Sequence, residues 1–340
     1  TSCEWPRGST APGQRTPHYL YEVDDDAPLD NGSVSYRVIM TRADSDTLRN
    51  RAVGSDVLLN CTFIGDGEVH HMAAIRYRGE NSRTLERKAY RIEFPPEDTF
   101  QGIESLNLNA SNRVGSVETS SLRDFLSADL FRRAGLPYPQ VWPVNLYFQR
   151  GVLGDLQGNA NVDPFYIRKE HFNRDFLSRY FGASGGGNFY RPVDAGAGSG
   201  DLAYRGEDPA DYVRSYEKRS NRDENDYSDI VELCRAFDTG ATPDAQFEDE
   251  MLRLIDVYEW AYFFAIQDFL TNIDGGIQTN NGEDYFLYRV PYESTRPDAG
   301  LWLILPWDLE ETFTDANTGL FITDVATVRP RCTMRPSART

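Results

Sequence analysis

Lysine is the scarcest charged residue in this sequence: only Lys88, Lys169 and Lys218 occur, so arginine supplies nearly all of the 35 basic side chains. Acidic residues number 53, which leaves a formal net charge of −18. A surface so short of positive charge repels nucleic-acid phosphates and anionic lipid. We therefore expect neither as a partner, and we treat a lysine inside a patterned segment as a candidate functional residue.

Long apolar runs are also missing. The longest candidate, 257–270, is interrupted by Glu259, Gln267 and Asp268, whereas a membrane-spanning helix needs about 20 predominantly apolar residues. The chain has 340 residues, of which 40% are hydrophobic, so it is long enough to bury a sizeable core and to form two lobes. These numbers predict a folded protein without a membrane span.

Cysteine is rare and widely spaced. Cys3, Cys61, Cys234 and Cys332 form no Cys-x-x-Cys pair, which argues against a zinc site. An even number at wide spacing is typical of two disulfides in an exported protein, and four buried free thiols are the alternative. Three pairings are possible. The one we would test first is Cys3–Cys61 with Cys234–Cys332, which keeps each bridge within one predicted lobe.

Strand and turn signals predict a sheet in the first half of the chain. Residues 1–32 are polar and proline-rich and predict an irregular leader. Gly65-Asp66-Gly67 predicts a hairpin turn between two β-rich segments. The predicted strands are 33–40, 57–64, 69–77, 90–94 and 144–148. Helices over 43–52 and 120–134 accompany a mostly antiparallel sheet.

Helical spacing dominates the second half. Apolar residues predict helices over 172–181 and 228–237, and a longest helix over 246–270 that is apolar on more than one face and hence buried. The glycine-rich segment 182–200 predicts a mobile loop or lobe connection. Two predicted strands follow, 285–290 and 301–305.

Oxygen ligands cluster after the longest predicted helix. Asp274 follows the helix, Asp284 precedes the first of the two strands, and Asp308 and Glu310 follow the second. Carboxylates in loops at strand ends suit Mg²⁺ that also binds substrate phosphates. The order is that of phosphoryl transfer, in which one Asp accepts the hydroxyl proton and another bridges metal and phosphate. Turns and helix caps are the simpler explanation of the same residues.

A second candidate site is basic. Arg78-Gly79 ends a predicted strand, Ser82 lies in the turn that follows, and Lys88 begins the next strand. Backbone amides and cations in such a turn can neutralise the charge of a triphosphate. An Arg-Gly turn with basic neighbours is also a common feature of ordinary hairpins.

Several motifs, in the same order, resemble the CotH kinase family, a group of secreted kinase-like proteins related to spore-coat protein H. The resemblance covers most of the chain from Asp56 to Phe313. The segments that carry it are Arg78-Gly-Glu-Asn-Ser82, Lys88-Ala-Tyr-Arg-Ile92, Gly102-Ile-Glu-Ser-Leu-Asn-Leu-Asn109, Ser121-Leu-Arg123, Asn188-Phe-Tyr-Arg191, Asn272-Ile-Asp274 and Trp307-Asp-Leu-Glu310.

The resemblance implies an α+β chain with a divergent two-lobed protein-kinase-like fold. An N-terminal antiparallel sheet lobe with a connecting loop would span 33–200, and a mainly helical C-terminal lobe with the catalytic and metal motifs would span 201–340. The implied activity is transfer of phosphate from ATP, with Mg²⁺ or Mn²⁺, to Ser or Thr of a protein substrate. Export to the cell envelope, surface or spore coat is implied as well, in agreement with the acidic surface and the cysteines.

The resemblance also carries over residue roles. Asp274 would be the base near the substrate hydroxyl, and Asp308 would hold the metal, with Asp284 and Glu310 beside it. Lys88 would contact the α- and β-phosphates.

Three further residues, Arg78, Ser82 and Arg123, would belong to the same nucleotide-binding cleft. Either Glu118 or Glu170 would pair with Lys88, and the sequence does not choose between them.

Two positions depart from the family pattern: Asp284 stands where the family has Asn, and Glu310 where it has Asp. The extra negative charge of Asp284 would alter the number or type of bound metal ions, and the longer side chain of Glu310 would alter the ligand geometry. The main alternative is a non-catalytic coat scaffold or adhesin that retains the fold. A retaining glycosidase using Asp274 and Asp308 is another, and it requires the two carboxyls roughly 5 Å apart. The acidic surface would favour a basic partner rich in Ser or Lys.

Overall fold

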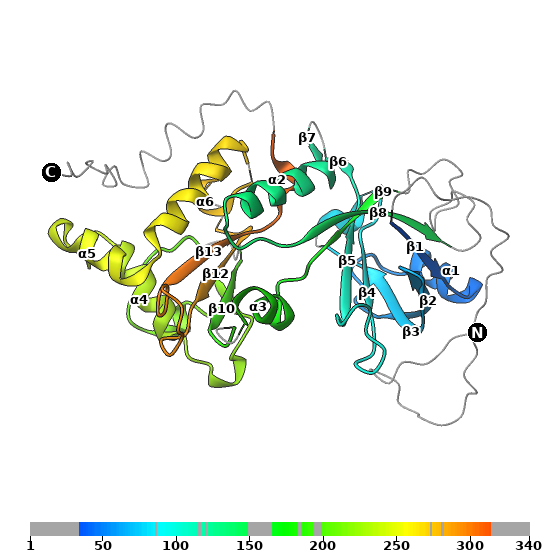
Figure 1. The fold of residues 1–340 in the computed structure, drawn as a ribbon, viewed down its shortest axis with the longest axis horizontal. Coiled ribbons are helices and arrows are strands. Elements are labelled where there is room, and N and C mark those ends of the chain that lie inside the picture. The colour runs from blue at the N-terminus through cyan, green and yellow to red at the C-terminus, as the bar shows by residue number, and fades with distance from the viewer. Residues whose placement is uncertain are drawn as a thin grey trace. The chain divides into compact units, whose positions relative to one another are not determined.

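The structure is a computed structural model that describes residues 34–79, 81–85, 87–114, 117–119, 121–148, 165–182, 185–193, 199–272, 274–279 and 282–313. The predicted leader, 1–32, lies outside this part of the chain. The chain divides into two compact units (Figure 1), Thr1–Phe125 with Pro139–His171 and Leu126–Tyr138 with Phe172–Thr340. Both units combine strands and helices, which confirms the α+β class. The lobe boundary near residue 200 stays a prediction.

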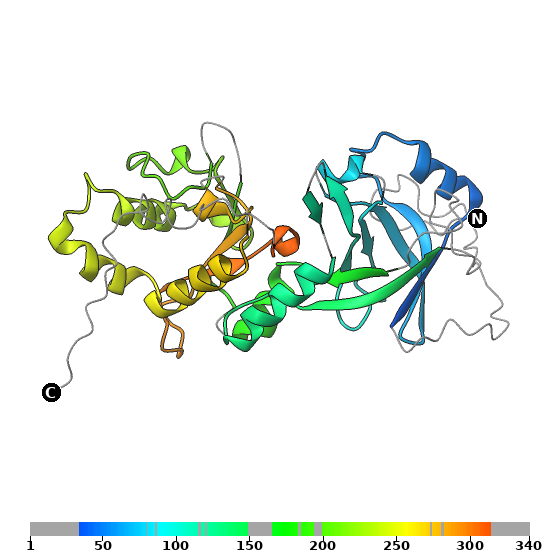
Figure 2. The same cartoon turned by 90° about the horizontal axis from the view of Figure 1, so that it is seen from above.

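The first unit contains a closed seven-stranded barrel, whose curved strands are seen in Figure 2. The strand order is β1-β2-β3-β4-β5-β9-β8. Neighbours are antiparallel except β1 and β8, which run parallel with Tyr36 opposite Leu146 and close the barrel. The strands are β1 (Ser35–Ile39), β2 (Leu59–Gly65), β3 (Glu68–Tyr77), β4 (Tyr90–Glu93), β5 (Ser105–Asn109), β8 (Val141–Phe148) and β9 (Phe165–Lys169).

Other elements lie between the barrel strands in the sequence. Helix α1 (Arg42–Asn50) follows β1, and the 3₁₀ helix η1 (Asn81–Thr84) lies between β3 and β4. Strands β6 (Asn112–Val114) and β7 (Val117–Thr119) form a separate pair, and α2 (Ser121–Arg133) follows them.

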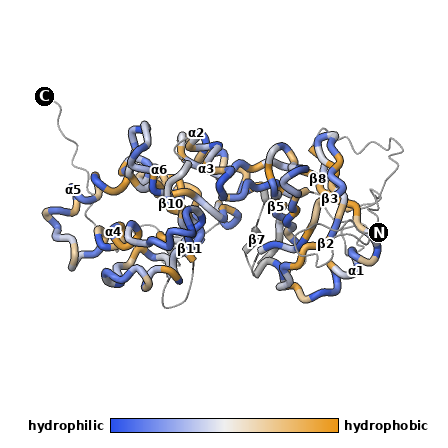
Figure 3. The backbone as a smooth tube through the Cα atoms, turned by 90° about the horizontal axis from the view of Figure 1, so that it is seen from below, coloured by the Kyte–Doolittle hydropathy of each residue, from blue (hydrophilic) through white to orange (hydrophobic). Residues whose placement is uncertain are grey.

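Aromatic rings fill the inside of the barrel, and a tight turn joins two of its strands. Phe63 meets Tyr36, Phe94 and Phe100 edge-on inside the barrel, with ring centroids 5.1 to 5.3 Å apart, a geometry that ring quadrupoles favour. Figure 3 shows hydrophobic stretches of β2 and β3 in orange. The predicted hairpin turn between these strands is confirmed, with positive φ at Asp66 (51°) and Gly67 (79°), as a two-residue turn requires.

The second unit is built on a four-stranded antiparallel sheet of order β11-β10-β12-β13. Its strands are β11 (Tyr216–Lys218), β10 (Asn188–Pro192), β12 (Tyr285–Arg289) and β13 (Trp302–Pro306). Its α-helices are α3 (Arg174–Phe181), α4 (Ser228–Phe237), α5 (Asp244–Leu254), α6 (Val257–Phe269) and α7 (Gly276–Thr279), and its 3₁₀ helices are η3 (Pro209–Asp211), η4 (Arg222–Glu224) and η5 (Leu309–Glu311).

Both faces of the β12–β13 pair are buried. Leu287 and Ile304 pack on one face with residues of α4 and α6, whereas Phe286 and Leu305 pack on the other with residues of α3. Helix α6 lies along β13 (Figure 1). Burial on both faces explains why these strands are continuous apolar runs in the sequence instead of alternating ones.

The single long helix predicted over 246–270 is wrong: the chain forms α5 and α6 with a break at Ile255 and Asp256. Ile255 pairs with Trp302 of β13, and the Asp256 amide donates to the Trp302 carbonyl at 3.2 Å. The backbone here therefore joins the sheet edge, and Asp256 caps a new helix. Complete burial was also wrong, because Leu252 and Phe269 are 58% and 71% exposed.

Candidate functional site

The β12–β13 pair places two of the predicted carboxylates at one end of the sheet. Tyr285, the first residue of β12, lies opposite Pro306, the last residue of β13. Asp284 therefore precedes one strand where Asp308 follows the other, and the Trp307 amide donates to the Asp284 carbonyl at 3.2 Å. Both aspartates have a left-handed backbone, with φ of 60° and 49°, which Asp tolerates better than most residues.

Asp274 reaches the same place from the end of α6. The buried Asn272 side chain accepts from the Asp274 amide at 3.2 Å and donates to Gln267 at 3.0 Å, which fixes the turn after the helix. The next turn passes so close to the chain before β12 that a Cβ on Gly276 would lie 1.7 Å from the Glu283 carbonyl oxygen. Only glycine fits there, so Asp274 is held against the segment that carries Asp284.

The segment after Asp308 is tied to the same region. The Phe313 amide donates to the Leu270 carbonyl at 2.6 Å, at the end of α6. Thr312 and Ser127 of α2 share a buried hydrogen bond at 2.8 Å. Glu310 lies between these contacts and Asp308, half-buried on η5.

The three aspartates interact electrostatically. Burial raises the pKa of Asp284 well above its usual range, and the negative charges of Asp308, Asp274 and Glu283 raise it further. A hydrogen bond with the Asp274 side chain acts in the same direction, so Asp284 is the partner that keeps the proton. The predicted residues Asp274, Asp284 and Asp308 are thus brought together in the second unit.

The donor set of this cluster fits a hard divalent cation, which binds carboxylate oxygens and is favoured by crowded negative charge. Within the described residues, no group of three or more His, Cys, Asp or Glu side chains is arranged to hold a metal ion.

The predicted phosphate-binding residues lie in the first unit. The Arg78 guanidinium donates to the Asn109 side chain, which joins the Arg-Gly turn to the end of β5. Lys88 donates to the carbonyls of Arg83 and Leu85 at 2.8 and 2.5 Å, and burial lowers the pKa of its amine.

Two further candidates are Ser82 of η1 and Arg123 of α2. The side chain of Ser82 lies outside the described atoms, and Arg123 is half-buried in the first turn of α2. Of the two predicted partners of Lys88, the Glu118 side chain also lies outside, and Glu170 accepts from the Gln140 amide at 2.9 Å. The acidic partner of Lys88 stays a prediction.

Lys169 and Asp124 form a buried ion pair that was not predicted from the sequence. The Lys169 amine lies 3.1 Å from the Asp124 carboxylate, and the two side chains are 1% and 0% exposed. The pair joins the end of β9 to the first turn of α2. The scarcity of lysine had marked Lys169 as a candidate, but nothing in the pattern indicated a partner 45 positions away. The third lysine, Lys218, is also buried and donates to the Asp226 carbonyl at 2.8 Å.

Cysteine pairing is not shown by the structure. Cys61 and Cys234 are buried free thiols, and burial raises the pKa of both, that of Cys234 to about 12. Their predicted partners, Cys3 and Cys332, lie outside the described residues. The two disulfides stay a prediction. Along the described segments, no helix is long and apolar enough to cross a membrane.

Comparison with known proteins agrees with these motifs. The family model described as "CotH kinase protein" matches residues 75–335. The "Inner spore coat protein H" of Bacillus subtilis (strain 168) is 26% identical over 241 residues, which are 70% of this chain and 58% of that protein. The chain thus spans somewhat more than half the length of this relative. The matched region contains Lys88 and the three clustered aspartates. The chain belongs to the CotH kinase protein family.

Proposed function

We propose that the protein is an atypical kinase with a divergent two-lobed protein-kinase-like fold. It transfers the terminal phosphoryl group of ATP to Ser or Thr of a protein substrate, with Mg²⁺ or Mn²⁺. The convergence of Asp274, Asp284 and Asp308 on one end of the β12–β13 pair is the observation that carries this proposal. The name of the family supports a kinase at the level of the whole family.

Each aspartate has a distinct role in the proposed reaction. Asp274 accepts the proton of the substrate hydroxyl on a carboxylate oxygen, while the hydroxyl oxygen bonds to the γ-phosphorus and the bond from γ-phosphorus to the bridging oxygen breaks. Asp308 and Asp284 are the residues that would hold a divalent cation, with Glu310 in support. When bound, that cation neutralises charge on the phosphates.

Positive charge for the nucleotide would come from Lys88 and Arg78 as phosphate-binding residues. Ser82 and Arg123 are the further nucleotide-binding residues of the proposal. Lys88 now binds main-chain carbonyls of the turn it would share with the nucleotide, so nucleotide binding requires its amine to exchange those acceptors for phosphate oxygens.

A non-catalytic coat scaffold is the second candidate. It is favoured by the relative, whose printed name is that of a coat protein. Both functions place the protein in a spore coat or at an exported surface. Nucleotide binding separates them, because a scaffold has no need of ATP.

The test is transfer of labelled phosphate from ATP to the protein itself and to a Ser-rich basic peptide, with Mg²⁺ and with Mn²⁺. Asp274→Asn keeps the shape of the side chain and should lower the rate about 10²- to 10⁴-fold, the usual contribution of a general base. Asp249→Asn, at an exposed site on α5, is the matched control and should leave the rate unchanged. No transfer with either metal, together with no thermal shift on adding ATP, would refute the kinase and leave the scaffold.

A further inference from the structure

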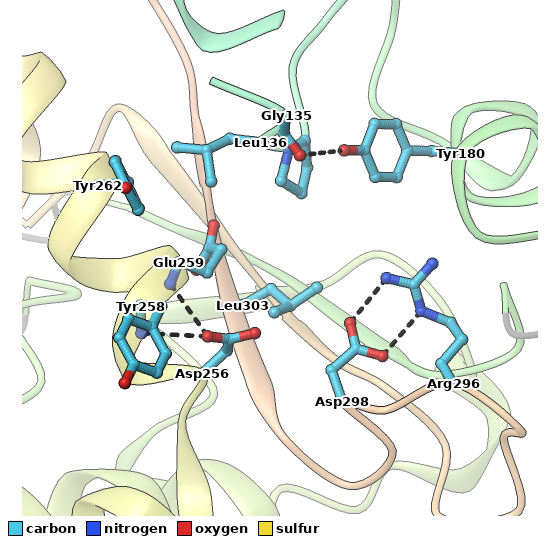
Figure 4. Close-up of a pocket in the computed structure, with 11 residues that line it drawn as sticks. Gly135, Leu136, Tyr180, Asp256, Tyr258, Glu259, Tyr262, Arg296, Asp298 and Leu303 are labelled. Atoms are coloured by element: carbon cyan, nitrogen blue, oxygen red, sulfur yellow. Dashed lines mark hydrogen bonds and ion pairs between the residues drawn. The ribbon is translucent and has the colours of Figure 1, made fainter. Parts of the chain in front are cut away.

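A cavity of about 250 Å³ lies in the second unit, at the opposite end of α6 from Asp274. Five segments surround it (Figure 4): the first half of α6, the loop after α2, the end of α3, the loop between β12 and β13, and the start of β13. Drug-sized ligands occupy cavities of roughly 300 Å³ or more. This one therefore suits a ligand about the size of one amino-acid side chain.

Glu259 lines this cavity and is only 7% exposed. One of its carboxylate oxygens, Oε2, accepts from the Ile304 amide at 3.1 Å. The other, Oε1, is buried and has no hydrogen-bond partner among the residues that the structure describes. Figure 4 shows the carboxyl group turned away from Asp256 and toward Leu136. A buried carboxylate oxygen without a donor is costly, and a donor entering the cavity would satisfy it.

The other charges of the cavity leave an excess of negative charge. Asp298 binds Arg296 through both oxygens, at 2.8 and 2.7 Å, so these two charges compensate each other. Asp256 accepts from the amides of Tyr258 and Glu259 at 3.1 and 3.0 Å and lacks an ion-pair partner within the described part of the second unit. Burial, followed by the charges of Asp256 and Asp298, raises the pKa of Glu259 well above its usual range.

The walls suit an aliphatic chain that ends in a cation. Leu136 and Leu303 supply apolar surface, and Tyr180, Tyr258 and Tyr262 supply aromatic rings. Tyr258 and Tyr262 are 74% and 58% exposed, so both rings line the cavity and also face solvent. Aromatic faces attract Lys and Arg side chains, whose apolar stems can lie along leucine.

We propose that this cavity is a docking site for the Lys or Arg side chain of a protein partner, with Glu259 as the buried acceptor of its charge. In the proposed kinase that partner is the protein substrate, and this part of the inference rests on the proposed function. Binding of the basic side chain in the cavity does not depend on the proposed function.

The length of α6 sets the spacing between docking and chemistry. Glu259 lies in the first turn, and the helix ends ten residues later at Phe269 (269 − 259), about 15 Å along its axis. An extended peptide covers that distance in about five residues. A substrate that uses both sites should therefore carry its basic residue at least about five positions from the Ser or Thr that accepts phosphate.

The test is binding of a dye-labelled Gly/Ser peptide that contains arginine, measured by fluorescence anisotropy without ATP. The control peptide has citrulline, which keeps the shape of arginine without its charge. A charge-assisted hydrogen bond predicts about ten- to a hundred-fold tighter binding of the arginine peptide. Glu259→Gln should abolish the difference, and Asp256→Asn, which keeps a helix cap, should reduce it. Asp268→Asn, exposed on the same helix, should retain it.

Equal affinity for the two peptides, or a Glu259→Gln protein that is folded by circular dichroism and still prefers arginine, would overturn the proposal. Agmatine is the probe for a free small cation: if it binds as tightly as the arginine peptide, the cavity is a small-cation site and docking is refuted. Because ATP is left out, loss of the kinase assignment would not change these outcomes. If transfer does occur, Glu259→Gln should lower kcat/KM for the arginine peptide and leave that for the citrulline peptide unchanged.

Discussion

The buried pair of Lys169 and Asp124 gives the sharpest prediction about stability. Replacing Lys169 by Met keeps the length and apolar stem of the side chain but leaves the Asp124 carboxylate buried without its cation. The pair is 3.1 Å apart, and its members are 1% and 0% exposed, so solvent screens it very little. Breaking such a pair costs about 3–5 kcal/mol. Asp124→Asn removes the negative charge beside the buried Lys169 amine and should lower the free energy of unfolding by a similar amount.

Hydrogen exchange measured by mass spectrometry can detect this loss of stability locally, in peptides from β9 and α2. Since about 1.4 kcal/mol is a factor of ten, protection of these peptides should fall by roughly two to three and a half orders of magnitude. The double variant Asp124→Leu with Lys169→Met removes both charges. It should recover most of the loss, because an apolar pair of similar volume commonly replaces a buried ion pair without penalty.

A surface ion pair of the same unit is the matched control. Arg49 and Asp46 of α1 lie 2.6 Å apart, but their side chains are 34% and 49% exposed. Solvent screening limits such a pair to about 0.2–1 kcal/mol, so Arg49→Ala should change protection less than about tenfold. If Lys169→Met lowers protection no more than Arg49→Ala does, or if the double variant is as unstable as the single ones, the reasoning about burial is wrong.

Two further predictions concern the second unit. Because the pKa of Glu259 is raised in the folded state, its contribution to stability is complete below about pH 4.3 and is lost as pH rises through the folded pKa. Urea titrations from pH 5 to 8 should show this decline in the free energy of unfolding for the wild type and a weaker decline for Glu259→Gln. Identical profiles of the two proteins would contradict the prediction. Gly276→Ala should lower the melting temperature and the rate of transfer, because its Cβ would collide with the Glu283 carbonyl. Gly186→Ala, where a Cβ meets nothing within 4 Å, should do neither, and equal effects of the two would count against the proposed fit.

Local sequence signals predicted most individual helices and strands, but not how the strands of the first unit close into a barrel. The strand β13 and the helix α4 follow directly from apolar runs and helical spacing. The parallel pairing of β1 with β8 joins segments about a hundred residues apart, and no local pattern encodes such a partner. The break before α6 did have a signal, since Asp256 followed three residues later by Glu259 is a helix-start pattern. Continuous apolar spacing concealed it.

The part of the candidate site that lies at the end of the β12–β13 pair was predictable from the sequence. Asp284 and Asp308 flank two adjacent strands, so pairing those strands brings the carboxylates to one end. Asp274 follows a helix, and its position depends on the Gly276 contact and on the buried Asn272, which the sequence shows only as a glycine and an amide. The partner of Lys169 could not be predicted, because it depends on a contact in three dimensions between the end of β9 and the first turn of α2.

The engagement of every lysine has a practical consequence for how this protein reacts. Lys169 and Lys218 are buried, and the half-buried Lys88 binds two carbonyl oxygens. Reagents and enzymes that acylate, alkylate or cross-link ε-amino groups therefore meet almost no accessible target on its side chains. Immobilisation or labelling through amines would disturb the interior before it marked the surface, whereas the numerous carboxylates offer ready points of attachment.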